Sequence, residues 1–154
     1  MSNMSILRNS LGLEFLWVPK PLFVNLPVKD LNRSVAFFNK LGFKFDPKFT
    51  DENATCMIVG ENIYVMLLLE KFFKTFTTKE LWDAKKSTEV LVCLSCDSRS
   101  EVDGLVIKAV AAGGSTPRKP QDHGFMYGHG FEDLDGHIWE LIYLEKTPQV
   151  FPKS

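Results

Sequence analysis

The sequence has few cysteines, no long apolar run and almost no excess charge, and each shortage excludes a class of protein. Three cysteines in 154 residues do not make a disulfide-built secreted domain, so we expect free thiols in a reducing, cytoplasmic compartment. No segment approaches the roughly 20 apolar residues of a membrane span. A formal net charge of −1 gives no basic footprint. We therefore expect neither a membrane nor a nucleic-acid partner.

The cysteine spacing also excludes a familiar chemistry. Cys93 and Cys96 form a C-x-x-C motif. A redox centre would need the motif at the N-terminus of a helix that follows a strand, and a zinc site would need a second pair of ligands. The sequence around the motif shows neither, so the motif predicts two structural thiols.

A carboxylate inside an apolar strand is the most distinctive feature that is present. Residues 133–144 begin with the turn signal Asp135-Gly136 and continue as an apolar run that contains Glu140. A charge in such a strand is costly unless it is paired or bound. Glu140 therefore faces either solvent or a functional site.

The pattern of apolar residues and turn signals repeats once along the chain. Each half predicts a strand, a helix and three further strands. Asp30 is the expected N-cap of the first helix and Gly42 its end, and Ser98 and Glu101 form a capping box for the second helix. The expected strands are 21–29, 43–45, 54–59 and 63–69 in the first half, and 89–95, part of 115–121, 125–132 and 136–144 in the second.

The repeat predicts an α+β domain built from two tandem βαβββ modules. We expect a curved mixed sheet around a cup, with the helices outside, and a cup of this kind suits a small molecule. The predicted boundaries are an N-terminal arm (1–20), a single domain (21–146) and a C-terminal tail (147–154). Within the domain we expect module one at 21–70, a linker at 71–87 and module two at 88–146.

The two modules can be aligned without a gap over their last strands. Residues 60–70 then lie over residues 135–145, and Val65 takes the place of Glu140. This alignment predicts that Val65 faces the cup, with Leu67 as the alternative position.

Three stretches resemble the glyoxalase/bleomycin-resistance/dioxygenase (vicinal oxygen chelate) superfamily. The opening Phe-Val-Asn-Leu-Pro-Val-Lys-Asp-Leu from residue 23, with Leu-Gly-Phe at 41–43, resembles its first strand and helix. Phe-Glu-Asp-Leu-Asp-Gly-His-Ile-Trp-Glu-Leu from residue 131 resembles its closing strand pair. Within the superfamily, residues 51–57, 62–68 and 121–128 are most similar to the bacterial predicted lactoylglutathione lyases.

The resemblance implies a divalent metal held by residues of the first and fourth strands of each module. The positions that match the two first-strand histidines are Phe23 and Leu91, and the carboxylate of module one is matched by Val65. Only Glu140 is a ligand type, and one carboxylate does not hold a metal that needs three or four ligands. We assign no cofactor, and a divalent metal bound by Asn25, Cys93 and Glu140 stays open as the alternative.

Two residues of the second module are further candidates. His129 lies in a strand flanked by glycines, where it is a base or a ligand beside Glu140 if it points into the cup. Tyr127 is a candidate wall for stacking, as are Phe125, Tyr64 and Trp139. The predicted ligand-binding residues are Asn25, Cys93, Phe23, Val65, Leu91 and Tyr127.

Two functions fit these residues. The first is a lactoylglutathione-lyase-like enzyme that acts on a small carbonyl compound or thiohemiacetal, with Glu140 and His129 as catalytic residues. The second is a metal-independent protein that sequesters a small molecule, in the manner of bleomycin-resistance proteins, and the apolar replacements favour it. The resemblance also implies a homodimer.

Overall fold

The computed structural model describes residues 5–8 and 14–146. The predicted C-terminal tail, 147–154, lies outside these residues, as do parts of the predicted arm. Strands β1 (Ser5–Arg8) and β2 (Glu14–Trp17) pair with each other and form a separate two-stranded sheet. No helix in the described part of the chain is long and apolar enough to cross a membrane.

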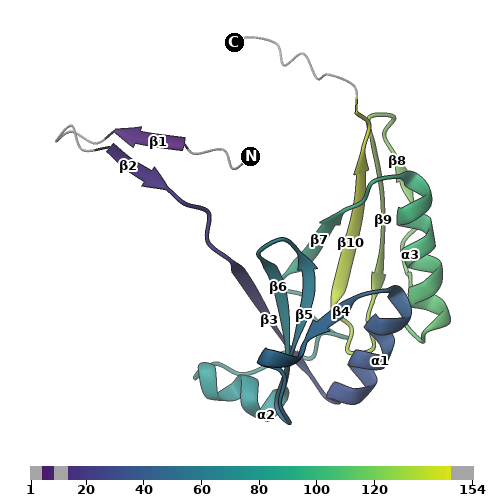
Figure 1. The fold of residues 1–154 in the computed structure, drawn as a ribbon. Helices are drawn as coiled ribbons and strands as arrows, with labels where there is room; N and C mark the ends of the chain where they lie inside the picture. Colours follow the sequence, from purple (N-terminus) through teal and green to yellow (C-terminus); the bar gives the residue numbers. More distant parts are fainter. Residues whose placement is uncertain (1–4, 9–13, 147–154) are drawn as a thin grey trace.

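The remaining elements form two βαβββ modules, as Figure 1 shows. Module one has the sheet order β3-β6-β5-β4 and module two the order β7-β10-β9-β8, so the first and fourth strands of each module are parallel neighbours. The predicted α+β class with two tandem modules is confirmed. The elements of module one are β3 (Leu22–Val28), α1 (Leu31–Leu41), β4 (Lys44–Asp46), η1 (Pro47–Phe49), β5 (Ala54–Gly60) and β6 (Ile63–Leu69). Those of module two are β7 (Leu91–Ser95), α3 (Arg99–Ala111), β8 (Gln121–Asp122), β9 (Met126–Glu132) and β10 (Ile138–Leu144).

The helices begin where their capping residues predict. The Asp30 carboxylate accepts a hydrogen bond from the Arg33 amide at 3.0 Å, and the Ser98 hydroxyl accepts one from the Glu101 amide at 3.0 Å. These bonds satisfy amides that have no partner inside a helix. Helix α1 ends at Gly42, whose φ of 101° suits glycine.

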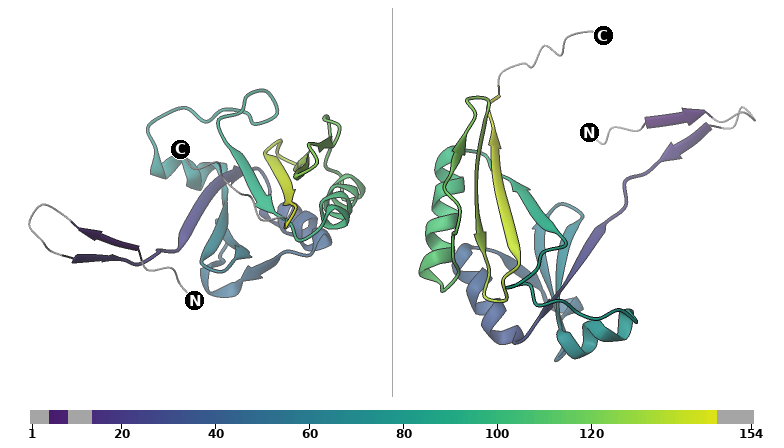
Figure 2. Two further views of the ribbon diagram at one scale, coloured as in Figure 1. Left: turned by 90° about the horizontal axis from the view of Figure 1, so that it is seen from above. Right: turned by 180° about the vertical axis from the view of Figure 1, so that it is seen from behind.

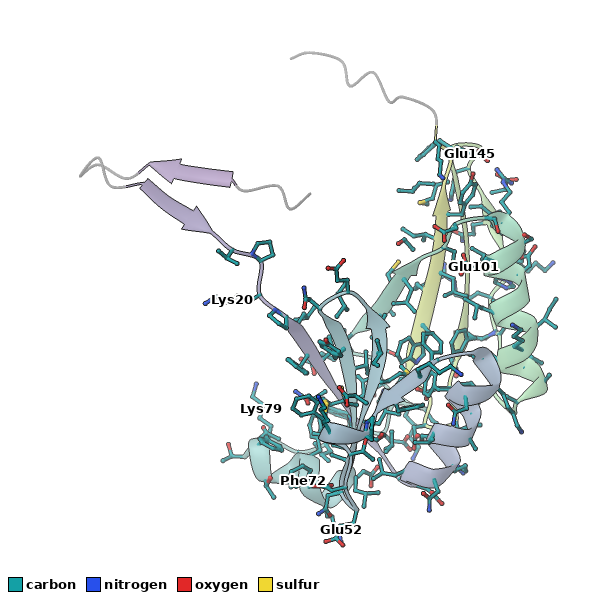
Figure 3. The ribbon with its side chains drawn as sticks, viewed as in Figure 1. Lys20, Glu52, Phe72, Lys79, Glu101 and Glu145 are labelled. Carbon is teal, nitrogen blue, oxygen red and sulfur yellow. The ribbon has the colours of Figure 1, made fainter. Side chains whose placement is uncertain are left out.

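A short helical link joins the modules. Helix α2 (Glu70–Phe73) and the 3₁₀ turn η2 (Lys74–Phe76) follow β6 directly. Phe72 and Phe76 contact each other edge to face, with ring centroids 5.2 Å apart, and Phe76 is 69% exposed. Figure 3 shows Phe72 at the end of module one that lies far from Glu101 on α3.

One hydrophobic core serves both sheets. Helices α1 and α3 pack beside each other, as the two views of Figure 2 show, and the core joins them to β6 of module one and to β9 and β10 of module two. Phe37 and Phe38 of α1 contact aromatic rings of the other module. Their ring centroids lie 6.1 Å from Phe131 and 5.1 Å from Trp139, respectively. The face of each sheet turned toward this core is thereby fixed, and we call the opposite face the open face.

The β9–β10 turn docks on the junction of β3 and α1. The Asp135 carboxylate accepts hydrogen bonds from the Lys29 amide at 3.0 Å and the Ser34 hydroxyl at 3.3 Å. His137 Nε2 donates to the Pro27 carbonyl at 2.6 Å. The stretch that predicted a hairpin therefore also joins module two to module one.

The predicted equivalence of Val65 and Glu140 is wrong by one residue. Val65 is 1% exposed and lies in the core, and Leu67, the alternative, is 0% exposed beside it. Cys93 pairs with Glu140 in module two, and the matching residue Asn25 pairs with Met66 in module one. The turns that precede β6 and β10 differ in length, and a shift of one residue moves every side chain to the other face.

Trp139 provides a direct test of this core. Its indole N–H donates to the buried Asp133 carboxylate at 3.0 Å, and the residue is 0% exposed. We expect Trp139→Phe to lower the free energy of unfolding by about 2–4 kcal/mol, since it leaves a cavity and a buried acceptor without its donor. Chemical denaturation measures this loss.

The matched control is Trp82→Phe, because Trp82 is 77% exposed. We expect a change within about 0.5 kcal/mol there. An equal loss in both variants would contradict the proposed role of Trp139.

Candidate functional site

The open face of module two carries Glu140. In β10, Trp139 and Leu141 point into the core at 0% exposure, so the residues between and beside them point the other way. The register pairs Cys93 of β7 with Glu140 and places both on the open face. The Glu140 side chain is 24% exposed, so this carboxylate lies on an otherwise apolar strand with limited access to water.

Two glycines in the neighbouring strand, β9, leave its backbone without side chains beside Glu140. Gly130 pairs with Glu140 and Gly128 pairs with Ile142, so both glycines lie on the open face of β9. A Cβ at position 130 would lie 2.8 Å from the Trp139 carbonyl oxygen, which explains the glycine structurally. A Cβ at position 128 would meet its nearest atom at 3.7 Å, which is an ordinary contact. Packing within the chain therefore does not require Gly128.

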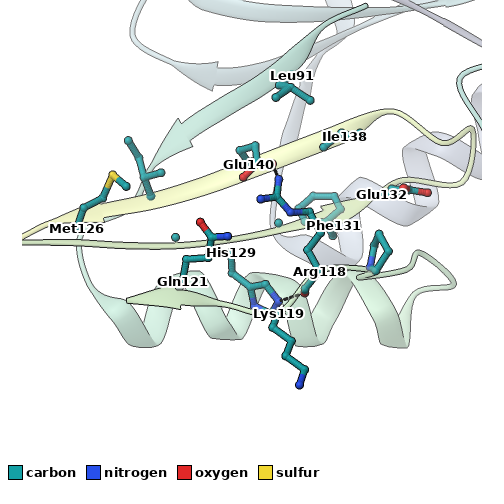
Figure 4. A pocket seen from close by; sticks show the side chains of 14 residues that line it. Leu91, Arg118, Lys119, Gln121, Met126, His129, Phe131, Glu132, Ile138 and Glu140 are labelled. Atoms are coloured by element: carbon teal, nitrogen blue, oxygen red, sulfur yellow. Dashed lines mark hydrogen bonds and ion pairs between the residues drawn. The ribbon is translucent and has the colours of Figure 1, made fainter. Parts of the chain in front are cut away.

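A cavity of about 190 Å³ opens over these glycines (Figure 4). Arg118 reaches over it from the loop before β8, and its Nη1 lies 3.4 Å from Glu140 Oε1. All of its lining residues come from module two: Leu91, Pro117, Arg118, Lys119, Gln121, Met126, Gly128, His129, Gly130, Phe131, Glu132, Ile138, Glu140 and Ile142.

His129 is one of the lining residues of this cavity, but its side chain lies on the other face of β9. It pairs with the core residue Leu141, so its ring does not share a face with Glu140. Its Nε2 donates to the Arg118 carbonyl at 3.0 Å and lies 3.1 Å from the Thr116 hydroxyl, as the dashed line to Arg118 in Figure 4 indicates. The structure thus does not bring the two predicted catalytic side chains together. Instead, His129 holds the backbone of the loop that carries Arg118.

Tyr127 also lies on the side of α3 and not in the cavity. Its hydroxyl donates to Asp103 at 2.7 Å, and the Arg99 guanidinium lies 5.1 Å from its ring centroid. Tyr127 therefore fastens β9 to α3, and the hydrogen bond to Asp103 raises the pKa of its hydroxyl. Trp139, also predicted as a stacking wall, is buried in the core. Neither side chain lies where it was predicted, because the sequence alone does not show which residues of β9 and β10 face the core.

Cys93 lies beside Glu140 as a neutral thiol. Burial raises the pKa of this thiol, and the nearby Glu140 carboxylate raises it further. Cys93 contributes to a second hollow of about 430 Å³, between β7 and the β5–β6 turn. Cys96, three residues along the chain, packs against the core.

The open face of module one is aromatic. Phe23 stacks on Tyr64 with ring centroids 4.8 Å apart, and Phe49 contacts Phe23 edge to face. Asn25 is exposed on the same face. Among the described residues, neither Phe23 nor Asn25 lines the cavity beside Glu140. Of the predicted ligand-binding residues, only Leu91 does so.

The residues present do not fit the metal that the resemblance implies. Phe23 and Leu91 occupy the positions of the two first-strand histidines. Met66 occupies the position at which module one would supply its carboxylate. No group of three or more His, Cys, Asp or Glu side chains in residues 5–8 and 14–146 has the arrangement of a metal site.

The fold is shared with solved structures. A family model described as bleomycin resistance protein-like N-terminal matches residues 20–60. The hypothetical protein SA1046 from S. aureus is 30% identical, with a TM-score of 0.71, over 82% of this chain and 95% of that one. The chain is thus similar to bleomycin resistance proteins over residues 20–60 and to the S. aureus protein over most of its length.

Two further superfamily structures share the fold at lower identity. An enzyme of the glyoxalase/bleomycin resistance protein/dioxygenase family from Burkholderia phytofirmans PsJN is 16% identical, with a TM-score of 0.68, over 82% of this chain and 99% of that one. The fosfomycin resistance protein FosX from Listeria monocytogenes is 19% identical, with a TM-score of 0.59, over 82% and 92% of the two chains. No curated protein matches the chain in sequence. These likenesses show the fold, and the ligand has to be inferred from the geometry of the site.

The sequence did not predict the position of Arg118 or the bare backbone of β9 at Gly128 and Gly130. Arg118 lies 22 residues before Glu140, in a loop whose polar sequence predicted only a short strand. Glycines 128 and 130 were noted as flanking His129, and their spacing of two was the signal that they share a face.

Replacement of each glycine by alanine is expected to change the stability of the fold differently. We expect Gly130→Ala to destabilise the fold by about 1–3 kcal/mol, because the added methyl group collides with the Trp139 carbonyl. We expect Gly128→Ala to leave stability unchanged or raised by up to about 1 kcal/mol, because alanine restricts the unfolded chain. Denaturant titration of both variants measures the difference, and equal losses would show that Gly128 is structural after all.

Proposed function

We propose that this chain is a metal-independent small-molecule binding protein whose ligand lies on the open face of module two. One observation carries the proposal. Gly128 leaves the backbone of β9 bare where the fold does not require a glycine, and the cavity above it is bordered by a charged pair, Arg118 and Glu140. A glycine within a strand lowers stability unless another backbone or a ligand approaches closely.

The chemistry of the cavity supports binding. Its walls are mainly apolar, and its charged groups include the Arg118–Glu140 pair, which is a composition found in small-molecule sites. Its volume is below the range of about 300–1,000 Å³ typical of sites for drug-sized ligands. The cavity thus suits a small ligand, or one end of a larger ligand.

The alternative is a lactoylglutathione-lyase-like enzyme with Glu140 as base. Its chemistry relies on a metal to polarise the substrate, and the ligand positions described above do not supply one. His129, the second predicted catalytic residue, lies behind the sheet. These placements favour binding over turnover.

The test combines a ligand screen with an enzyme assay. We expect compounds from a small-molecule library to raise the melting temperature of the wild-type protein. They should lose that effect in Gly128→Val, whose side chain fills the floor of the cavity. Glu61→Gln, in an exposed turn, is the matched control and should respond as the wild type does. Turnover of a methylglyoxal–glutathione hemithioacetal, dependent on added divalent metal and lost in Glu140→Gln, would contradict the proposal.

We further propose that the protein forms a homodimer through its edge strands. Strands β3 and β7 have no partner on their outer sides in the described sheets, and each begins with an exposed apolar residue. Leu22 is 55% exposed and Leu91 52%, while Ile63, the neighbour of Leu22, is 44% exposed. Unpaired strand edges with apolar side chains are surfaces that proteins normally cover.

Leu22→Lys tests this arrangement, because it places a charge in the edge without touching the cavity. We expect light scattering to give the mass of two chains for the wild type and of one chain for Leu22→Lys. The control is Val110→Lys on α3, at a residue that is 45% exposed and lies away from both edges. A monomeric wild type would refute the dimer.

A further inference from the structure

The charged pair that borders the cavity, Arg118 and Glu140, leaves most of its hydrogen-bonding capacity free. Among the described residues, the guanidinium of Arg118 makes one hydrogen bond, from Nη1 to Glu140 Oε1 at 3.4 Å. A guanidinium has five N–H donors and a carboxylate has two acceptor oxygens. The pair therefore presents free donors and a free acceptor side by side.

The loop that carries Arg118 is fastened from behind the sheet. His129 Nε2 donates to the Arg118 carbonyl at 3.0 Å, and the Thr116 hydroxyl donates to the Gly130 carbonyl at 2.8 Å. Since a carbonyl only accepts, Nε2 carries the proton. The other nitrogen of the ring, Nδ1, is buried without a hydrogen-bond partner in the described structure. His129 is thus a positioning residue for Arg118.

The charges of the pair determine which ligand groups it accepts. Arg118 and Glu140 sum to zero charge, and Glu140 is only 24% exposed, so water screens it incompletely. An anion that binds Arg118 lies beside the Glu140 carboxylate and is repelled by it. A cation that binds Glu140 lies beside the guanidinium and is repelled in the same way. A neutral group that carries an acceptor and a donor side by side satisfies both partners.

The two glycines beneath the charged pair determine the shape of the ligand group that binds there. Gly128 and Gly130 remove the side chains that would otherwise rise from β9 beneath the pair. A flat group can lie directly on the bare backbone there, between Ile138 and Ile142 of β10 and the Arg118 loop.

From this geometry we infer that the cavity recognises a planar, uncharged carboxamide-like group. The carbonyl oxygen of the group accepts from Arg118, and its N–H donates to Glu140. A lactam or an amide-bearing aromatic ring has this chemistry. The inference rests on the proposed binding function and names the class of ligand.

Three probes of nearly identical shape separate charge from shape. Benzamide, benzoate and benzamidinium share a flat ring and a planar head group that is neutral, anionic and cationic, respectively. Ligand-observed NMR titrations of the full chain with each probe measure their dissociation constants. For the wild type we expect benzamide to bind at least about fivefold more tightly than either ion.

Substitution within the pair should reverse the order in opposite directions. In Glu140→Gln the unbalanced Arg118 should make benzoate the tightest of the three probes, by about tenfold over its binding to the wild type. In Arg118→Gln the unbalanced Glu140 should do the same for benzamidinium. Glu61→Gln is the control, because it removes an equal charge from a distant turn, and it should retain the wild-type order.

The outcomes distinguish this inference from the proposed function. Binding that is lost in Gly128→Val, but in which an ion binds the wild type as tightly as benzamide does, overturns the inference alone. Reversals that fail to occur in the two variants also overturn it alone. If no probe binds the wild type, the inference falls, and failure of the wider library as well overturns the proposed function.

Discussion

The position of Trp139 in the core determines the rest of the site. Its ring packs between the rings of Phe38 and Phe131, and its N–H is held by Asp133, whose carboxylate also accepts from two backbone amides of the β9–β10 turn. Successive residues of a strand point to opposite faces. With Trp139 fixed on one face, Glu140 has only the other available. The buried aromatic residue thus places the Glu140 carboxylate on the open face.

Local signals predicted the fold because they act over a few residues. The caps at Asp30 and Ser98 and the stop at Gly42 each depend on neighbours along the chain, and each stands where expected. The site depended on strand parity and on contacts between distant segments. A one-residue error in aligning two turns placed Val65 on the open face, and His129 and Tyr127 lacked any signal for their side of β9. The approach of Arg118 to Glu140 spans 22 residues of chain and has no local signature.

The two modules share a topology and differ in chemistry. Equivalent ladder positions carry Asn25 and Met66 in module one, and Cys93 and Glu140 in module two. The open face of module one became aromatic, whereas that of module two has a bare strand and a charged pair. A metal bound between two modules needs ligands from both, and here only module two supplies a carboxylate.

Stability does not explain the charged pair. A salt bridge that water reaches contributes about 0–1 kcal/mol, and the Arg118 side chain is 63% exposed. Glu140 meanwhile loses hydration on an apolar strand, which opposes folding. A partly desolvated carboxylate with a single weak partner is therefore a net cost to the folded chain. Gly128 also lowers the stability of the folded chain, although the fold would accept a side chain there. Two adjacent features that each lower stability, and that border one cavity, are together explained by a ligand that contacts both.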